Sequence, residues 1–193
     1  MSKVYFTSDW HLNDPRIGTG GQPNLFYRPF SSIEDQNLAM LDGLFKSSFS
    51  DGDTLYHLGD VVYSALEPFN TDIYLSKLKE LYPNSKFNLI IGNYDEKQLG
   101  FLQLYFNIIG ENCHIEINGR KYFLNHYPSK CIQKDGDDNI FNITGHIHGL
   151  WKVQKNMVNV GVDAWHFKPV SEDEIDFVRN ACEKYYDNNV FPY

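Results

Sequence analysis

Residues 3–11 read KVYFTSDWH, a run of β-branched and aromatic residues that ends in a polar turn carrying an aspartate and a histidine. Such runs are typical of short β-strands, and the turn residues mark where each strand ends. The pattern recurs at residues 53–60 (DTLYHLGD) and 86–95 (KFNLIIGNYD). It returns at residues 121–126 (KYFLNH) and 139–148 (NIFNITGHIH). The sequence therefore predicts a series of short strands, each followed by a polar loop.

Helical patterns follow the first three of these strands. Residues 31–49 begin with the capping box Ser31-x-x-Glu34, and residues 71–81 and 95–106 are shorter helix candidates. Apolar residues at spacings of three and four define the expected core-facing side of the first helix: Leu38, Leu41, Phe45 and Phe49. Because strands that alternate with helices are usually parallel, the first half of the chain predicts a parallel arrangement.

The second half of the chain is expected to be mostly β-structure with one closing helix. Asn118-Gly119 is the preferred two-residue turn of a β-hairpin. A second capping box, Ser171-x-x-Glu174, is followed by apolar residues at helical spacing: Ile175, Val178, Cys182 and Tyr185. This order favours an α/β fold with a mixed sheet, or two packed sheets, and helices on the outside. The length of 193 residues favours one domain spanning residues 1–193.

The composition excludes several classes of protein. With 42% hydrophobic and 16% aromatic residues, the chain is too apolar to be disordered. Its 25 acidic against 17 basic residues give a net charge of −8, which disfavours long nucleic acids and anionic membranes as partners. No apolar stretch approaches the roughly 20 residues of a membrane span. Three scattered cysteines and an N-terminus without a signal-peptide pattern lead us to expect a soluble, cytoplasmic protein.

The turns after the predicted strands carry seven residues of the types that bind metal ions: Asp9, His11, Asp60, Asn93, His126, His146 and His148. Each of them alone has a simpler explanation, since an aspartate after a strand usually forms a turn and an isolated histidine is usually a hydrogen-bonded core or surface residue. In open α/β sheets, however, ligands bind beyond the carboxyl ends of the strands. We therefore expect these side chains to gather at one sheet edge.

The chemistry of this set favours transition metals. In Asp9-x-His11 and in His146-x-His148 the two side chains share one face of an extended segment and can chelate one ion. Carboxylate, amide and imidazole ligands together suit Mn²⁺, Fe²⁺, Co²⁺, Ni²⁺ or Zn²⁺ better than Ca²⁺ or Mg²⁺. Seven ligands exceed the roughly four to six positions of one such ion. The set therefore predicts two divalent ions that share one carboxylate.

The ordered blocks Asp9-x-His11, Gly59-Asp60, Gly92-Asn93, His126 and Gly145-His146-x-His148 resemble the signature of the calcineurin-like metallophosphoesterases. Residues 28–30 (RPF) and 159–171 (NVGVDAWHFKPVS) are similar to a small bacterial and phage subgroup of that family. The resemblance implies a four-layered α/β/β/α sandwich of two mixed β-sheets flanked by helices. It also implies a two-metal site at one sheet edge, with a metal-bridging hydroxide as the nucleophile.

The same resemblance implies which residues hold each ion. The first ion would be bound by Asp9, His11, Asp60 and His148. The second ion would be bound by Asp60, Asn93, His126 and His146. Asp60 would therefore bridge the two ions.

One position departs from the family pattern. Tyr94 stands where the family has the histidine of G-N-H-[D/E], which is generally assigned to protonate the leaving oxygen. Asp95 would orient this residue. A tyrosine donates hydrogen bonds but, with a reference pKa of about 10, is a slower proton donor than histidine. We therefore expect Asn93, Tyr94 and Asp95 to act in catalysis, with good leaving groups and diesters favoured over monoesters.

Three further features bear on the site. Residues 13–29 contain three prolines and three glycines and are expected to form a lid or a substrate loop. Arg28, near the end of this loop, is either a substrate-binding residue that contacts a phosphate group or a solvated side chain. His57 precedes Gly59-Asp60 and is either a partner of the metal ligands or a core residue.

The sequence thus predicts a cytoplasmic, di-metal hydrolase of small phosphorylated substrates, with phosphodiester or nucleotide-type substrates favoured. Two alternatives remain, a non-catalytic metal-binding scaffold of the same fold and a nuclease that acts on single strands. Retention of all the expected ligand types argues against the scaffold, and the excess of acidic residues argues against the nuclease. The oligomeric state is not predicted.

Overall fold

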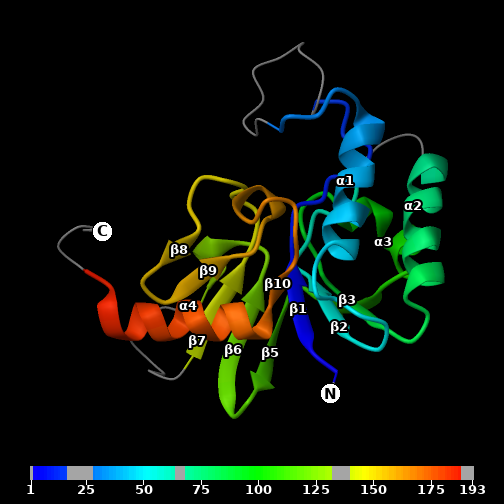
Figure 1. Cartoon of the computed structure of the whole chain (residues 1–193). Coiled ribbons are helices and arrows are strands. Elements are labelled where there is room, and N and C mark those ends of the chain that lie inside the picture. Colours follow the sequence, from blue (N-terminus) through cyan, green and yellow to red (C-terminus); the bar gives the residue numbers. More distant parts are fainter. Residues whose placement is uncertain (1, 17–27, 64–67, 132–139, 188–193) are drawn as a thin grey trace.

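The computed structural model describes residues 2–16, 28–63, 68–131 and 140–187. Its framework is two five-stranded sheets (Figure 1). The first sheet has the order β10 (Val170–Ser171), β1 (Val4–Thr7), β2 (Thr54–His57), β3 (Lys86–Ile90) and β4 (Asn107–Gly110). The second sheet has the order β5 (Asn112–Ile117), β6 (Arg120–Asn125), β7 (Ile140–Thr144), β9 (Met157–Asn159) and β8 (Val153–Gln154).

Both sheets are mixed, and their parallel strands determine where the site forms. Strands β1 to β4 are mutually parallel, whereas β10 pairs with β1 in the antiparallel sense. In the second sheet, β6, β7 and β9 are parallel, with β5 and β8 antiparallel at the two edges. The carboxyl ends of β1, β2 and β3 therefore lie at one edge, as the alternation of strands and helices predicts.

Helices flank the sheets, so the predicted α/β fold of two mixed sheets is confirmed. The helices are α1 (Ile33–Phe45), α2 (Pro68–Leu81), α3 (Leu99–Leu102) and α4 (Glu172–Tyr185), with short 3₁₀ turns at Glu96–Gln98, Pro128–Lys130 and Val162–Ala164. Helices α1, α2 and α3 lie beside the first sheet, and α4 lies beside the second (Figure 1). Helix α4 is fixed there in part by Arg179, whose guanidinium stacks on Tyr122 of β6 and donates to the Lys121 carbonyl.

The core has two parts because successive side chains of a strand point to opposite faces. In β1, Tyr5 packs in a cluster with Met40 and Leu44 of α1, while Phe6 packs in a second cluster with Leu124 of β6. Both side chains are almost fully buried. Burial on both faces is expected for the central strands of a parallel sheet. The second cluster joins the two sheets and holds their strand ends next to one another.

The core-facing side predicted for α1 is only partly right, since Phe49 is buried and Leu41 packs against the cluster that contains Tyr5, but the other two residues are not buried. Leu38 and Phe45 are 46% and 67% exposed, whereas the residues that α1 buries are Gln36, Asn37, Met40, Gly43 and Leu44. The reason is that Gln36 donates to the His11 carbonyl and Asn37 bonds to Asn13, so polar contacts with the loop after β1 set the helix rotation. The spacing of hydrophobic residues in the sequence does not reveal such polar contacts.

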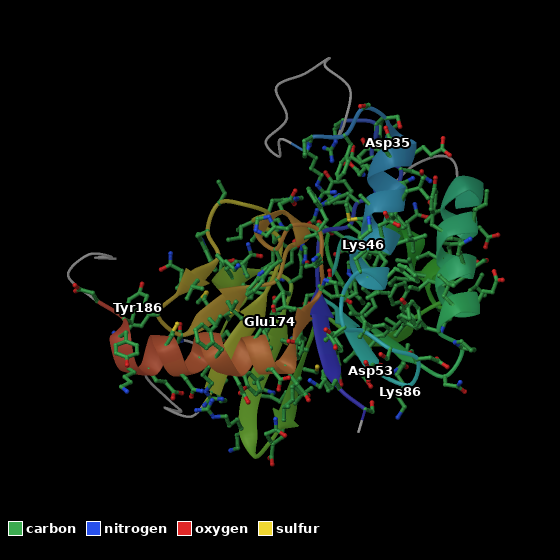
Figure 2. The ribbon with its side chains drawn as sticks, in the orientation of Figure 1. Asp35, Lys46, Asp53, Lys86, Glu174 and Tyr186 are labelled. Carbon is green, nitrogen blue, oxygen red and sulfur yellow. The ribbon has the colours of Figure 1, made fainter. Side chains whose placement is uncertain are left out.

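Smaller differences concern the ends of elements. The N-cap of α1 is Ser32, which accepts from the Asp35 N–H, one residue later than the predicted capping box. The capping box at Ser171 and Glu174 is confirmed. Figure 2 labels Asp35 and Glu174 near the starts of the two helices. Asn118 and Gly119 form the predicted hairpin turn between β5 and β6, with φ angles of 52° and 74°. The helix predicted for residues 95–106 is reduced to a 3₁₀ turn followed by α3.

Most of the predicted lid, residues 17–27, lies outside the described residues. Within the described parts of the chain, none of the helices has the length and apolar character that a membrane crossing requires. The single-domain assignment stays a prediction.

Candidate metal centre

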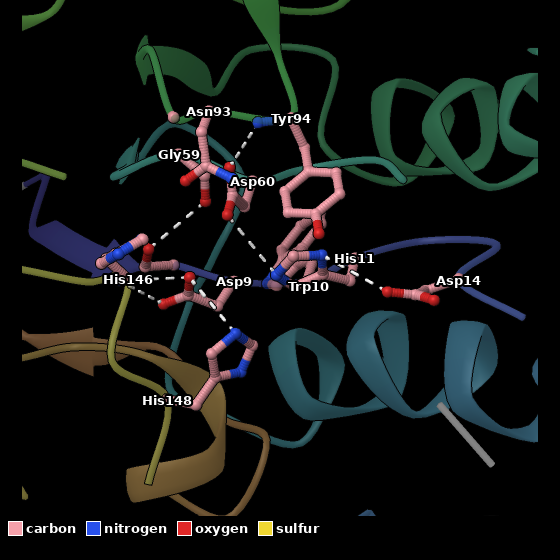
Figure 3. Close-up of polar contacts among 12 residues, drawn as sticks. Asp9, Trp10, His11, Asp14, Gly59, Asp60, Asn93, Tyr94, His146 and His148 are labelled. Carbon is pink, nitrogen blue, oxygen red and sulfur yellow. Dashed lines mark hydrogen bonds and ion pairs between the residues drawn. The ribbon is translucent and has the colours of Figure 1, made fainter. Parts of the chain in front are cut away.

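The seven predicted ligands lie together at the edge where the parallel strands end, and Figure 3 labels all of them except His126. Asp9 and His11 follow β1, Asp60 follows β2, Asn93 follows β3, His126 follows β6, and His146 and His148 follow β7. The two sheets are connected directly at this point. The backbone N–H of His146 donates to the Asp9 carboxylate, and the His126 ring is hydrogen-bonded through Nδ1 to the Leu58 carbonyl at 2.6 Å.

The ligand atoms form two groups. Those of Asp9, His11 and His148 lie within 4.8 Å of one another, and so do those of Asp60, His126 and His146. The Asp60 carboxylate lies between the groups, since its Oδ2 is 3.5 Å from His11 Nε2 and 3.4 Å from His126 Nε2. Asn93 joins the second group, with its Oδ1 3.3 Å from His126 Nε2. Asp60 is therefore close to both groups, and its bridging role stays a prediction.

Five of these residues adopt a backbone conformation that L-amino acids rarely take. Their φ angles are positive: 61° at Asp9, 48° at His11, 58° at Asp60, 73° at His146 and 51° at His148. Such strain persists only where the surrounding structure enforces it, and it concentrates at functional sites. At this site the positive φ angles turn the side chains of these residues out of the strand direction and toward one another.

Glycines leave room for this close approach. A Cβ at Gly59, which has a φ of 93°, would lie 2.5 Å from His126 Nδ1. A Cβ at Gly92 would lie 2.3 Å from Asp60 Oδ1 and 2.6 Å from the Asp60 nitrogen. Both contacts are shorter than real side chains permit. The glycines of the Gly59-Asp60 and Gly92-Asn93 blocks are therefore required by packing around the ligands.

Asp95 supports the loops that carry two of the ligands. It is fully buried, and its carboxylate accepts hydrogen bonds from the backbone N–H groups of Asp60, Val61 and Gly92 at 2.8, 2.9 and 3.0 Å. Burial and the charge of Asp60 raise the pKa of Asp95 to about 7, and the three hydrogen bonds oppose this shift. The expected catalytic role is therefore corrected to a positioning role, because a side chain with no exposed surface does not touch a substrate.

Arg28 also lies behind the ligands, which corrects its expected role in substrate binding. It is only 3% exposed, and its guanidinium donates to both carboxylate oxygens of Asp163 and to the Asp9 and Trp10 carbonyls. Asp163 in turn lies 2.7 Å from His148 Nδ1. A carboxylate on the far ring nitrogen fixes the orientation of a histidine ligand. Arg28 and Asp163 thus orient His148 and the loop after β1.

Sequence reasoning did not single out Asp163. It lies within residues 159–171, and the one signal in that segment is its similarity to a family subgroup. Although burial opposes ionisation, the hydrogen bonds from His148 and Arg28 lower the pKa of Asp163. The carboxylate is therefore ionised and available to His148 at neutral pH.

The electrostatics of the centre favour cations. Asp9 and Asp60 are both buried, and burial raises the pKa of Asp9. Burial would also raise that of Asp60, but the hydrogen bond and charge of His126 outweigh it and lower the Asp60 pKa to about 2. Burial opposes protonation of His126, yet Asp60 and Asp9 raise its pKa to about 9. Two buried carboxylates require cationic partners, and together with imidazole and amide donors they fit two divalent transition-metal ions.

Tyr94 and His57, the two remaining candidates from the sequence, have different surroundings. Tyr94 is half-buried, its backbone N–H donates to Asp60 Oδ1 at 2.9 Å, and its ring lies 4.9 Å from the His11 ring (Figure 3). His57 is fully buried, packs edge-on against Trp10, and has no hydrogen-bond partner for either ring nitrogen among the described residues. Burial lowers the pKa of His57 to about 3. His57 is therefore a core residue.

Comparisons with known proteins agree with this geometry. The family model of the calcineurin-like phosphoesterases matches residues 2–190. Protein AQ665 from Aquifex aeolicus, a solved structure of unknown function, is 27% identical with a TM-score of 0.66, covering 92% of this chain and 99% of that chain. Yfce, a phosphoesterase from E. coli, shares the fold at 18% identity and a TM-score of 0.50, covering 82% and 78% of the two chains. No curated protein sequence matches significantly. The chain belongs to the calcineurin-like phosphoesterase family.

Proposed function

We propose that this protein is a metal-dependent hydrolase of phosphate esters that acts on small phosphodiester or nucleotide-type substrates. The observation that carries the proposal is the pair of ligand groups with the Asp60 carboxylate between them. Each group combines carboxylate and imidazole donors, which suit Mn²⁺, Fe²⁺, Co²⁺, Ni²⁺ or Zn²⁺. When bound, two such ions would supply Lewis-acid activation of the phosphate and of the attacking water.

The protein's own contribution is to hold the ligands in place. Asp9, His11, Asp60 and His148 would bind one ion, and Asp60, Asn93, His126 and His146 would bind the other. The support for this division is the grouping of the ligand atoms and the position of Asn93 beside His126. The Leu58 carbonyl and Asp163 each engage the Nδ1 atom of a histidine ligand and leave its Nε2 directed into the centre.

Charge and exposure favour a small phosphorylated substrate. Two divalent ions opposed by the Asp9 and Asp60 carboxylates leave a local charge of about +2, whereas the whole chain carries −8. A small phosphate ester is therefore attracted to the centre, while a long nucleic acid or an anionic membrane is repelled by the remaining surface. Asn93 and His146 are exposed, so a phosphate can approach the second group from solvent.

Tyr94 favours diesters within this class. A tyrosine hydroxyl donates a hydrogen bond but protonates a poor leaving group more slowly than an imidazolium does. We also propose a cytoplasmic location, since Cys113, Cys131 and Cys182 form no disulfide bond, as suits a reducing compartment.

The proposal is tested by reconstituting metal-stripped protein with each candidate ion and measuring turnover of bis(p-nitrophenyl) phosphate, p-nitrophenyl phosphate and a nucleotide. We expect metal-dependent turnover that is faster for the diester than for the monoester. Asp60→Asn should abolish it. The matched control is Asp51→Asn, which changes an exposed aspartate that bonds to Asn84 and should leave turnover unchanged. A protein that binds no metal and shows no metal-dependent turnover would contradict the proposal and favour the scaffold alternative.

A further inference from the structure

Arg16 contacts Asp14 and Tyr94, two residues beside the metal centre, although the sequence pattern did not single it out. Its side chain is 45% exposed, in contrast to the buried Arg28. The guanidinium makes a bidentate contact with Asp14. Its Nε lies 3.0 Å from Oδ1 of that carboxylate, and its Nη2 lies 2.7 Å from Oδ2. Asp14 is fully buried, and its carboxylate also lies 3.8 Å from His11 Nδ1 (Figure 3). Arg16 is thus attached to the first ligand group through a fixed carboxylate.

Two aromatic rings restrict the guanidinium further. Its central carbon lies 4.7 Å from the centre of the Tyr63 ring and 5.3 Å from that of Tyr94. These two rings lie 5.6 Å from one another. Stacking on aromatic faces is favourable for an arginine and limits its rotamers. The cation is therefore held in place before any substrate arrives.

The contact between Arg16 and Tyr94 has a fixed direction. Arg16 Nη2 lies 2.8 Å from the Tyr94 hydroxyl oxygen. Because a guanidinium only donates hydrogen bonds, the tyrosine oxygen is the acceptor and its own hydrogen remains available for another group. A hydroxyl that accepts from a cation becomes a stronger donor, since consecutive hydrogen bonds polarise one another. The Tyr94 ring cannot turn away easily, because its backbone is bonded to Asp60 and its ring packs on His11.

We propose that Arg16 is a positioning residue that holds the Tyr94 hydroxyl as a hydrogen-bond donor to the leaving-group oxygen of a phosphodiester. This inference rests on the proposed function and specifies how the same site treats its substrate. In the reaction, the oxygen of water forms a bond to phosphorus and the phosphorus–oxygen bond to the leaving group breaks. One hydrogen of that water ends on the departing alcohol and the other leaves with the phosphate product or to solvent. Tyr94 keeps its proton and stabilises the charge that develops on the departing oxygen.

The leaving group provides the test, because a hydrogen bond to the departing oxygen matters most when that oxygen is a poor leaving group. Wild type, Arg16→Ala, Tyr94→Phe and the double variant are compared on thymidine 5′-phenyl phosphate and thymidine 5′-(p-nitrophenyl) phosphate with Mn²⁺. On the phenyl ester, each single variant should lower kcat about 10- to 100-fold, as expected for loss of a hydrogen bond to a charged group. On the p-nitrophenyl ester, the loss should be about threefold or less. The double variant should be no slower than either single variant, because both remove the same interaction.

Controls separate this role from folding and from metal binding. Arg16→Ala removes the side-chain partner of the buried Asp14 carboxylate, which keeps the hydrogen bond from the backbone N–H of residue 16. Tyr94→Phe keeps the contact between Arg16 and Asp14, so it tests the hydrogen bond to the leaving group even if Arg16→Ala is unstable. Metal content and melting temperature of Tyr94→Phe should equal those of wild type. Arg120→Ala removes an arginine at the opposite end of β6 from His126, where it pairs with Asp176 and Glu183, and should leave both esters unaffected.

Each outcome has a definite meaning. Variants that are as active as wild type, or that lose the same factor on both esters, would overturn the role of Arg16 and leave the proposed function intact. A metal-loaded wild type that hydrolyses neither ester would overturn the proposed function, and this inference with it.

Discussion

Replacing Gly92 by alanine tests directly how closely the chain packs around the Asp60 carboxylate of the metal centre. The added methyl group would lie 2.3 Å from Asp60 Oδ1 and 2.6 Å from the Asp60 backbone nitrogen. Carbon and oxygen atoms that are not bonded rarely approach closer than about 3 Å. The carboxylate that lies between the two ligand groups must therefore move by about 0.7 Å or more. The backbone of the same residue is blocked as well, so rotating the side chain does not relieve the contact.

A displacement of this size exceeds what a metal site tolerates. Metal–ligand distances vary by only about 0.2 Å, so Asp60 would be lost as a good ligand to both ions. We expect the affinity of Gly92→Ala for Mn²⁺ to fall about 10- to 100-fold or more. The free energy of unfolding of the metal-free protein should fall by about 1–3 kcal/mol, the usual cost of overpacking a filled interior. Affinity is measured by titration calorimetry and stability by urea unfolding.

The chain provides a matched control in Gly100→Ala. Gly100 lies in α3, and a Cβ there would meet no atom of the described residues within 4 Å. The same substitution should therefore leave metal affinity unchanged and stabilise the protein by about 0.5–1 kcal/mol, because alanine favours a helix over glycine. A Gly92→Ala protein that binds Mn²⁺ as tightly as Gly100→Ala would refute the reasoning.

Three further predictions concern individual side chains. Tyr94→His should raise turnover of aryl monoesters with poor leaving groups, because an imidazolium is the faster proton donor; unchanged rates at equal metal content would contradict this. His57→Leu should reduce the loss of stability in acid. In the folded wild type the pKa of His57 is lowered to about 3. The unfolded wild type therefore binds one more proton than the folded protein below about pH 6.5. The free energy of unfolding of the wild type should fall by about 2 kcal/mol between pH 7 and 5 for this reason. Urea unfolding at both pH values measures this, and an equal loss in the variant would refute it. Mn²⁺ binding at pH 7.5 should release about one proton from His126, because its pKa is about 9 in the metal-free centre. Calorimetry in two buffers of different ionisation enthalpy measures the protons released, and a value of zero would contradict the prediction.

The strands and ligands were predictable because both follow from local sequence. The sequence predicts strands at residues 3–8, 53–58 and 86–91, and β1, β2 and β3 begin and end within one residue of these ranges. Each is followed by a candidate ligand. Strands β8 and β10, with two residues each, were not predicted. Such short edge strands exist through pairing with their neighbours and have no pattern of their own.

The side chains that support the ligands were not predictable in the same way. Arg28 and Arg16 lie near the two ends of one Pro- and Gly-rich stretch. Nothing in the sequence shows that the first is buried on Asp163 while the second is partly exposed and bonded to Asp14 and Tyr94. Likewise, the rotation of α1 depends on Gln36 and its bond to the His11 carbonyl. These roles depend on contacts between segments far apart in the chain, so only the folded structure assigns them.

The most direct test of the two-ion account is a titration of metal-stripped protein with Mn²⁺, in which bound metal and turnover of bis(p-nitrophenyl) phosphate are measured on the same samples. The grouping of the ligands around Asp60 predicts that turnover rises until two equivalents are bound and then stays constant. Turnover that saturates at one equivalent, or its absence when two equivalents are bound, would contradict the account.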